Sequence, residues 1–303
     1  MVIQTSALTK MYNGVNVVNG VNLSIEQGEI FGLLGKNGAG KSTLIGMLTG
    51  FVIPTSGAIS LFDRPYSEMN RVKARMGVLP DTSNYYQDLN AVQHLNYLGA
   101  LLGVRSSREE LVHQLEQVGL KGHEFKKIRG FSFGMKKKLG IAQALLGRPE
   151  LIILDEPTSG LDPESAQEIQ QLVMSCASQG RTIMLTSHNL HEIEKICTKV
   201  AIMDKGQIAC SGTMRELREH FQSEIKLSIA LNPFTPEQEQ LLKRKLAPLA
   251  AELHLSSGRM TAVLTEEAVI PQLVALLVQE QMQVFRVEVE QKSLEQIFFE
   301  TGA

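Results

Sequence analysis

The stretch from Gly35 to Thr43 constrains the fold more than any other part of the chain. It reads GKNGAGKST and fits the pattern G-x-x-x-x-G-K-[ST]. The apolar run 30–34 precedes it and predicts a short buried strand, and a helical pattern begins at about Lys41. The order strand, glycine-rich loop and helix is typical of a phosphate-binding loop, or P-loop.

The residue types in this loop suit a nucleoside triphosphate. Glycines let the backbone curl so that its N–H groups point at phosphate oxygens. Lys41 would place a charge on the β- and γ-phosphates, and the Ser42 hydroxyl would ligate Mg²⁺. A dinucleotide site is disfavoured, because Thr43 stands where the pattern G-x-G-x-x-G needs a glycine. The predicted nucleotide-binding residues of the loop are Asn37, Gly38, Ala39, Gly40, Lys41, Ser42 and Thr43.

Composition excludes several classes of protein. The formal net charge of −2 and the 20% of charged residues give no general basic surface for nucleic acid and no acidic excess typical of disorder. The three cysteines, Cys176, Cys197 and Cys210, match no metal motif and predict a reduced, cytoplasmic location. No segment approaches the roughly 18 apolar residues of a membrane span, so we expect membrane contact only through another chain.

The hydrophobic pattern predicts two domains. Strand patterns at 2–5 and 15–25 predict a β subdomain, and helices and buried strands then alternate to about residue 209, which predicts a mainly parallel α/β sheet. We place this domain at 1–220, with a helical subdomain at about 88–140. Residues 221–303 follow the order βαββαβ and predict a small ferredoxin-like α+β domain.

A second acidic motif follows another apolar run. The segment LIILDE predicts a buried strand that ends in Asp155 and Glu156. Ligands bind at the carboxyl ends of parallel strands in open α/β sheets. We expect Asp155 to hold Mg²⁺, mainly through water, and Glu156 to polarise an attacking water molecule.

Several motifs in a fixed order give the chain a strong resemblance to the ABC transporter ATPases. Between the P-loop and Asp155 lies FSFGMKKKLGIA, which is similar to the signature motif of this family at Ser132 and Gly134. The segment SGLD, ending at Asp162, resembles its D-loop, and His188 resembles its switch histidine. Tyr12 is similar to the A-loop aromatic residue that stacks on adenine. The resemblance covers about residues 2–220.

The resemblance implies a P-loop NTPase fold that binds ATP and Mg²⁺ and hydrolyses ATP. Glu156, His188 and Lys41 would be catalytic. The family works as a dimer, so Ser132 and Gly134 would contact the γ-phosphate held by a second copy or a paired ATPase. A separate multi-span permease would bind the helical segment, which implies a peripheral place on the inner face of the membrane.

Two places depart from the family pattern. Asp81 occupies the position of the Q-loop glutamine, and it is a candidate Mg²⁺ ligand. Phe133 and Met135 replace the glycine and glutamine of the signature motif. The form FSFGMKK nevertheless resembles the group that exports bacitracin-type and lantibiotic-type peptides or drugs. The closing segment 293–299 is similar to that of ABC-2-type exporters.

Other interpretations stay open at this point. A non-transport ABC ATPase usually has a long coiled-coil insertion or two ATPase modules in one chain, and neither is present. A P-loop kinase would leave the signature motif, Asp162 and His188 without a role. The intact Lys41, Asp155 and Glu156 oppose a binding-only subunit, whereas Phe133 and Asp81 leave it open. Tyr12 and His188 could be structural residues, and the lysines at 136–138 could be a solvated helix face.

Overall fold

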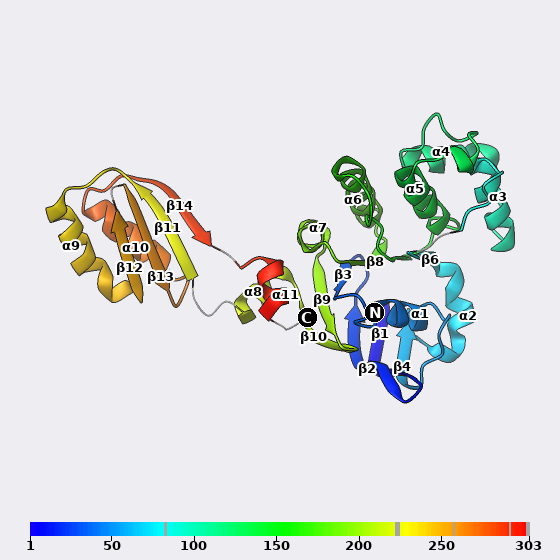
Figure 1. The fold of residues 1–303 in the computed structure, drawn as a ribbon, viewed down its shortest axis with the longest axis horizontal. Helices are drawn as coiled ribbons and strands as arrows, with labels where there is room; N and C mark the ends of the chain where they lie inside the picture. The colour runs from blue at the N-terminus through cyan, green and yellow to red at the C-terminus, as the bar shows by residue number, and fades with distance from the viewer. Residues whose placement is uncertain (82–83, 222–224, 257, 291, 301–303) are drawn as a thin grey trace. The chain divides into compact units, whose positions relative to one another are not determined.

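The computed structural model describes residues 1–81, 84–221, 225–256, 258–290 and 292–300. The chain forms two compact units (Figure 1). The first comprises Met1–Met214 with the residues from Phe298 onward, and the second comprises Arg215–Ile297. The predicted boundary at residue 220 falls a few residues after this division, and it stays a prediction. Within the described residues, no helix is long and apolar enough to cross a bilayer.

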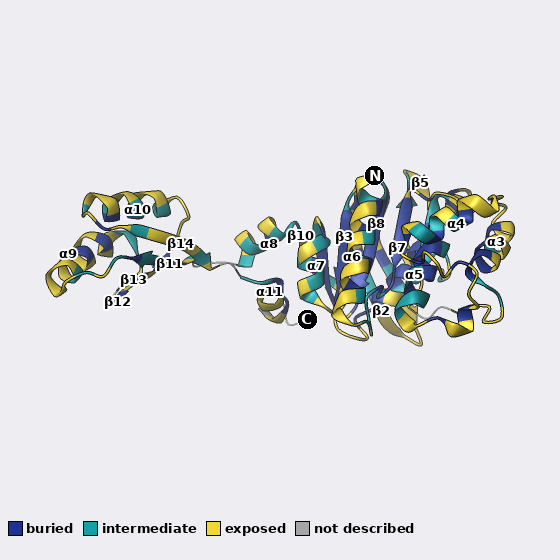
Figure 2. Ribbon diagram, turned by 90° about the horizontal axis from the view of Figure 1, so that it is seen from above, coloured by how far each residue is buried: buried dark blue, intermediate teal, exposed yellow. Residues whose placement is uncertain are grey.

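A six-stranded sheet forms the centre of the first unit. Its strand order is β10-β9-β3-β8-β7-β6, and every pairing is parallel except that of β10 with β9. Strands β3, β7 and β8 are buried at every position, as expected for parallel strands covered on both faces (Figure 2). The strands are β3 (Ile30–Leu34), β6 (Met76–Leu79), β7 (Leu151–Leu154), β8 (Thr182–Ser187), β9 (Lys199–Asp204) and β10 (Gln207–Gly212).

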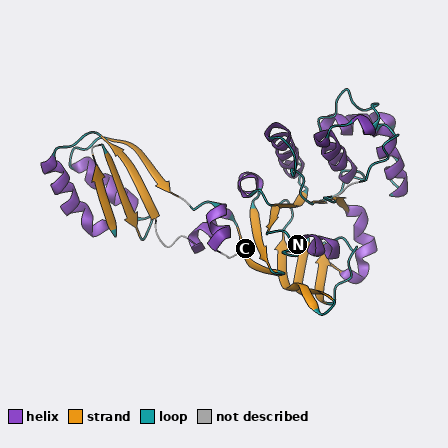
Figure 3. Cartoon of the chain, in the orientation of Figure 1, coloured by secondary structure: helices purple, strands orange, loops and turns teal. Residues whose placement is uncertain are grey.

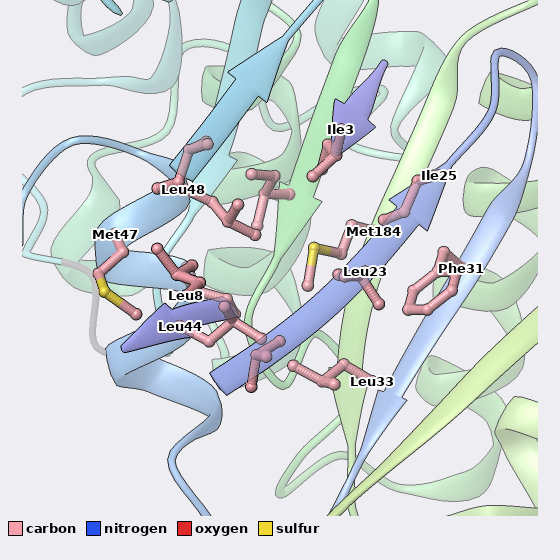
Figure 4. Close-up of a cluster of buried hydrophobic side chains, with 14 of the residues drawn as sticks. Ile3, Leu8, Leu23, Ile25, Phe31, Leu33, Leu44, Met47, Leu48 and Met184 are labelled. Carbon is pink, nitrogen blue, oxygen red and sulfur yellow. The ribbon is translucent and has the colours of Figure 1, made fainter. Parts of the chain in front are cut away.

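An antiparallel sheet of order β2-β1-β4-β5 makes the predicted β subdomain. Its apolar side chains pack with those of helix α1 and strand β3 in one core, where Leu8, Leu44 and Leu33 are fully buried (Figure 4). This packing fixes α1, and therefore the loop before it, against the sheet. The elements are β1 (Ile3–Tyr12), β2 (Val15–Ile25), β4 (Ser56–Leu61), β5 (Arg64–Pro65) and α1 (Lys41–Leu48).

Helices make up the rest of the first unit. Asn90 and Ser107 begin α3 and α4 with capping boxes, and Ser132 and Asp162 cap α5 and α6 with their side chains. Helices α3, α4 and α5 pack together as the predicted helical subdomain. The helices are α2 (Met69–Val72), α3 (Ala91–Leu101), α4 (Arg108–Gln117), α5 (Phe133–Ala144), α6 (Pro163–Ser178) and α7 (Leu190–Ile196).

The second unit has a four-stranded antiparallel sheet of order β12-β13-β11-β14 with helices packed against it, drawn as orange strands and purple helices in Figure 3. The chain order is βαββαβ, which is the ferredoxin-like arrangement. Leucines of both helices pack on alternate residues of β11, so the helices cover one face of the sheet. The elements are β11 (Ile225–Leu231), α9 (Pro236–Leu246), β12 (Glu252–Ser256), β13 (Arg259–Leu264), α10 (Val269–Gln279) and β14 (Val284–Glu290), flanked by α8 (Met214–Phe221) and α11 (Leu294–Glu300).

Candidate functional site

The glycine-rich loop joins the carboxyl end of β3 to the first turn of α1. Gly38 and Gly40 have φ angles of 83° and 105°, in the left-handed region that favours glycine. A Cβ on Gly40 would come within 2.6 Å of the Val17 carbonyl oxygen. Position 40 therefore admits no side chain. The N–H groups at the start of α1, Ser42 and Thr43 included, make this end of the helix a site for anions.

Lys41 lies in this loop with its side chain buried. Its Nζ donates hydrogen bonds to the carbonyl oxygens of Gly35, at 2.6 Å, and Lys36, at 3.2 Å. Burial lowers the pKa of Lys41, and Glu156 and Asp155 partly offset this by raising it. The ammonium therefore has only neutral hydrogen-bond acceptors in these two contacts, and a phosphate oxygen would be a stronger partner.

The predicted acidic pair lies at the end of β7, beside β8. Asp155 is buried, and its Oδ1 accepts a hydrogen bond of 2.6 Å from the hydroxyl of Thr186 on β8. The same hydroxyl accepts a hydrogen bond of 2.9 Å from the backbone N–H of Glu156. Thr186 thus sets the positions of both acids. Sequence reasoning missed it, although a threonine near the carboxyl end of a buried apolar strand was an available signal.

Glu156 has an unusual backbone conformation. Its φ angle is +49°, a region that non-glycine residues rarely adopt and that costs energy to maintain. Its Oε2 lies 2.8 Å from Nδ1 of His188, which follows β8 and has a side chain 63% exposed. A carboxylate only accepts hydrogen bonds, so this contact places a proton on Nδ1. The structure therefore brings Glu156 and His188 together at the carboxyl ends of adjacent strands.

The signature residues lie at the start of α5. The Ser132 hydroxyl accepts a hydrogen bond of 3.2 Å from the N–H of Met135. Phe133 occupies the position where the family pattern expects backbone to approach phosphate. The residue is 55% exposed, and its ring lies beside Gly160. Gly134 faces α6, because a Cβ there would lie 3.3 Å from the Ser165 hydroxyl oxygen. The bulk of residue 133 is thus directed at the D-loop segment.

The D-loop ends in a helix cap. Asp162 accepts hydrogen bonds from the backbone N–H of Ser165, at 3.1 Å, and from its hydroxyl, at 2.8 Å. These bonds hold the pKa of Asp162 below its ordinary value, with the backbone bond the larger cause. This geometry gives Asp162 a structural role as the cap of α6. A nucleotide contact by this residue stays a prediction.

Tyr12 ends β1, and its residue surface is 44% exposed. The Nζ of Lys10 lies 4.9 Å from the centroid of its ring. The Lys10 ammonium lies over one face of the ring, so the opposite face is the one that would stack on a base. The structure neither buries Tyr12 in the core nor joins it to the loop, so its role at adenine stays a prediction.

The donor groups around Ser42 and Asp155 fit a magnesium ion. A serine hydroxyl and a carboxylate are hard oxygen donors of the kind that Mg²⁺ prefers. Nowhere in the described part of the chain do three or more His, Cys, Asp or Glu side chains gather in a way that could hold a metal. Asp81 follows β6, and its carboxylate is 57% exposed.

Lys137 is a second residue that sequence reasoning missed. The hypothesis of a solvated helix face is wrong for this lysine, because only 7% of its side chain is exposed. Its Nζ donates a hydrogen bond of 2.8 Å to the carbonyl oxygen of Glu156. The neighbouring Lys138 instead forms an ion pair of 2.7 Å with Glu168 on α6.

Known proteins are similar to this chain in sequence and in fold. Residues 18–159 match the ABC transporter family. The bacitracin transport ATP-binding protein BcrA of Bacillus licheniformis is 42% identical over 210 residues, which are 68% of this chain and 68% of that protein. The linearmycin resistance ATP-binding protein LnrL of Bacillus subtilis (strain 168) is 32% identical over 303 residues, covering 98% of this chain and 96% of that protein.

A solved structure of an ATP-binding subunit of an ABC transporter is also similar, with 29% identity, a TM-score of 0.66 and coverage of 73% of this chain and 93% of that one. Among curated relatives, the matched segment spans from 64% to 96% of their own length. The P-loop and the acidic pair at the end of β7 lie where the sequence predicted them. The chain therefore belongs to the ABC transporter family, as an ATP-binding subunit that hydrolyses ATP.

Proposed function

We propose that this chain works in a pair, as a homodimer or with a related ATPase, and drives a separate membrane permease. The ATP hydrolysis that would power this work is supported by the Glu156–His188 contact at the strand ends next to the P-loop. This contact supplies a carboxylate with a fixed orientation beside a site for the γ-phosphate. The pair has the geometry of a general base and the residue that orients it.

Each residue would then have a defined part in hydrolysis. Lys41 and the N–H groups of the P-loop offset the charge that grows on the transferring phosphoryl group. Glu156 accepts a hydrogen bond from the attacking water and keeps it in line with the γ-phosphate. His188 fixes the Glu156 carboxylate through Nδ1. Ser42 and Asp155 would hold Mg²⁺, which when bound neutralises phosphate charge.

The signature motif supports the pairing. Ser132, Gly134 and the first N–H groups of α5 form a helix N-terminus suited to an anion. They belong to a different helix from the P-loop, which precedes α1. We propose that they contact the γ-phosphate bound by the other ATPase of the pair. Phe133 is compatible with this role, because its ring lies beside Gly160.

We propose that the permease exports a peptide antibiotic, a drug or a similar amphiphile. Support comes from relatives whose names concern bacitracin transport and linearmycin resistance. The chain would lie at the inner face of the cell membrane, and the helical segment 88–125 would bind the permease. The described residues contain no membrane-crossing helix, so in this proposal the cargo path is formed by the permease.

The test is ATP turnover by the purified chain, alone and co-purified with a neighbouring multi-span membrane protein. We expect turnover to rise when that protein is present, and to rise further with an exported amphiphile. Turnover that is indifferent to the membrane protein would favour a non-transport ABC ATPase. An absence of turnover in both preparations would favour a binding-only subunit.

A further inference from the structure

Lys137 carries a buried charge between three separate segments of the first unit. It lies in the second turn of α5, and its Nζ is 2.8 Å from the Glu156 carbonyl oxygen after β7. The same Nζ is 3.8 Å from Oδ1 of Asp81 after β6. One ammonium group therefore connects the signature helix with the ends of two adjacent strands. A buried cation is tolerated only when such partners compensate its lost hydration.

The electrostatics agree with this position. Burial lowers the pKa of Lys137, while Asp81, Glu156 and Asp155 raise it in that order of importance. Asp81 is the largest of the three stabilising charges. Its carboxylate is more than half exposed, whereas its partner ammonium is almost completely enclosed. Asp81 therefore favours the charged form of Lys137 more than either acid of the site does.

The contact with Glu156 bears on catalysis because of the backbone at that residue. Glu156 is held in the left-handed region by a hydrogen bond at each end: its N–H donates to Thr186 and its carbonyl accepts from Lys137. Costly backbone conformations persist only where the surrounding structure fixes them. If the carbonyl is released, the peptide can rotate, and the carboxylate leaves its orientation toward His188.

We propose that Lys137 is a positioning residue for hydrolysis and that Asp81 acts on the reaction through Lys137, not as a metal ligand. The inference rests on the role proposed above for Glu156. It is supported by the distance of 3.8 Å between Oδ1 of Asp81 and Nζ of Lys137. Asp81, which stands where the family has a glutamine, thereby gains an ion-pair partner in Lys137 on α5.

A double-mutant cycle on the full chain tests this assignment. Lys137→Gln, Asp81→Asn and the double variant are compared for kcat, for the KM of ATP and for the Mg²⁺ concentration that gives half-maximal turnover. Lys138→Gln is the matched control, because it makes the same change on the same helix at a lysine that pairs with Glu168. Asp81→Glu is the conservative variant.

We expect Lys137→Gln to lower kcat about tenfold, which corresponds to ~1.4 kcal/mol, with the KM of ATP within about twofold of the parent value. Asp81→Asn lowers kcat by about threefold and leaves the Mg²⁺ requirement unchanged. The double variant resembles Lys137→Gln alone, since coupled residues are not additive. Lys138→Gln and Asp81→Glu resemble the parent.

Two results would overturn the inference. The first is a raised Mg²⁺ requirement in Asp81→Asn that persists in the Lys137→Gln background, because it would make Asp81 a metal ligand. The second is an equal loss of kcat in Lys137→Gln and Lys138→Gln.

If Lys137→Gln does not fold, the variants at the exposed Asp81 still test the inference, because a parent-like kcat for Asp81→Asn also refutes it. A failure of the role of Glu156 is distinct: Glu156→Gln would then retain hydrolysis.

Discussion

Replacement of Thr186 by valine removes one hydroxyl that serves both acids of the site. The hydroxyl donates a hydrogen bond of 2.6 Å to Asp155 and accepts one of 2.9 Å from the N–H of Glu156. A hydrogen bond to a charged group contributes about 1.5–3 kcal/mol and a neutral one about 0.5–1.5 kcal/mol. We therefore expect Thr186→Val to cost about 3 kcal/mol of unfolding free energy. At about 2–4 °C per kcal/mol, Tm falls by about 6–12 °C.

Turnover should fall with stability, because both Asp155 and Glu156 lose the group that sets their positions. We expect kcat to drop at least about tenfold, or ~1.4 kcal/mol. Scanning calorimetry and steady-state turnover at a temperature where the variant is folded measure the two effects. Thr182→Val is the control: it lies on the same strand, and its hydroxyl accepts one bond from the N–H of Gly28. A Tm change below about 2 °C with a parent-like kcat in Thr186→Val would refute the reasoning.

Two further predictions concern the loop and a buried thiol. Gly40→Ala should weaken binding of an ATP analogue at least about tenfold, because Gly40 has a positive φ angle and its Cβ would meet the Val17 carbonyl oxygen. Gly180→Ala is the control in the same titration and should bind normally, because Gly180 also has a positive φ angle but has open space around it. Burial raises the pKa of Cys197 to about 12, so its alkylation at pH 8.5 should be at least about 100-fold slower in the native chain than in urea, by peptide mass spectrometry. The folded state keeps this proton, whereas an unfolded thiol loses it at about pH 8.5. The contribution of Cys197 to the free energy of unfolding therefore falls as the pH rises above about 8.5. Equal alkylation rates in the native chain and in urea would contradict the raised pKa of Cys197.

Local patterns made much of the fold and part of the site predictable. The P-loop needs particular residue types at adjacent positions, so Gly40, Lys41 and Ser42 could be identified one by one. Asp155 and Glu156 were predictable because an apolar strand that ends in acids places them at a sheet edge. The helix caps Ser132 and Asp162 also follow from short-range chemistry.

Other features depend on tertiary packing that no local pattern records. Lys137 lies among three lysines of equal appearance, and only the packing of α5 against the strand ends buries it. The positive φ of Glu156 carries no signal in its residue type, since glycine is the usual occupant of that region. The direction of Phe133 is set by the space beside Gly160, which comes from another segment.

The most direct test of the account is the variant Glu156→Gln, which keeps the shape of the side chain and removes its charge. We expect it to bind ATP with parent affinity, to lose hydrolysis by at least about 100-fold, and to accumulate as an ATP-bound dimer in sedimentation analysis. Lys41→Met, which removes the phosphate-binding charge, should stay monomeric under the same conditions. A Glu156→Gln chain that stays monomeric with saturating ATP and hydrolyses it at the parent rate would contradict the account.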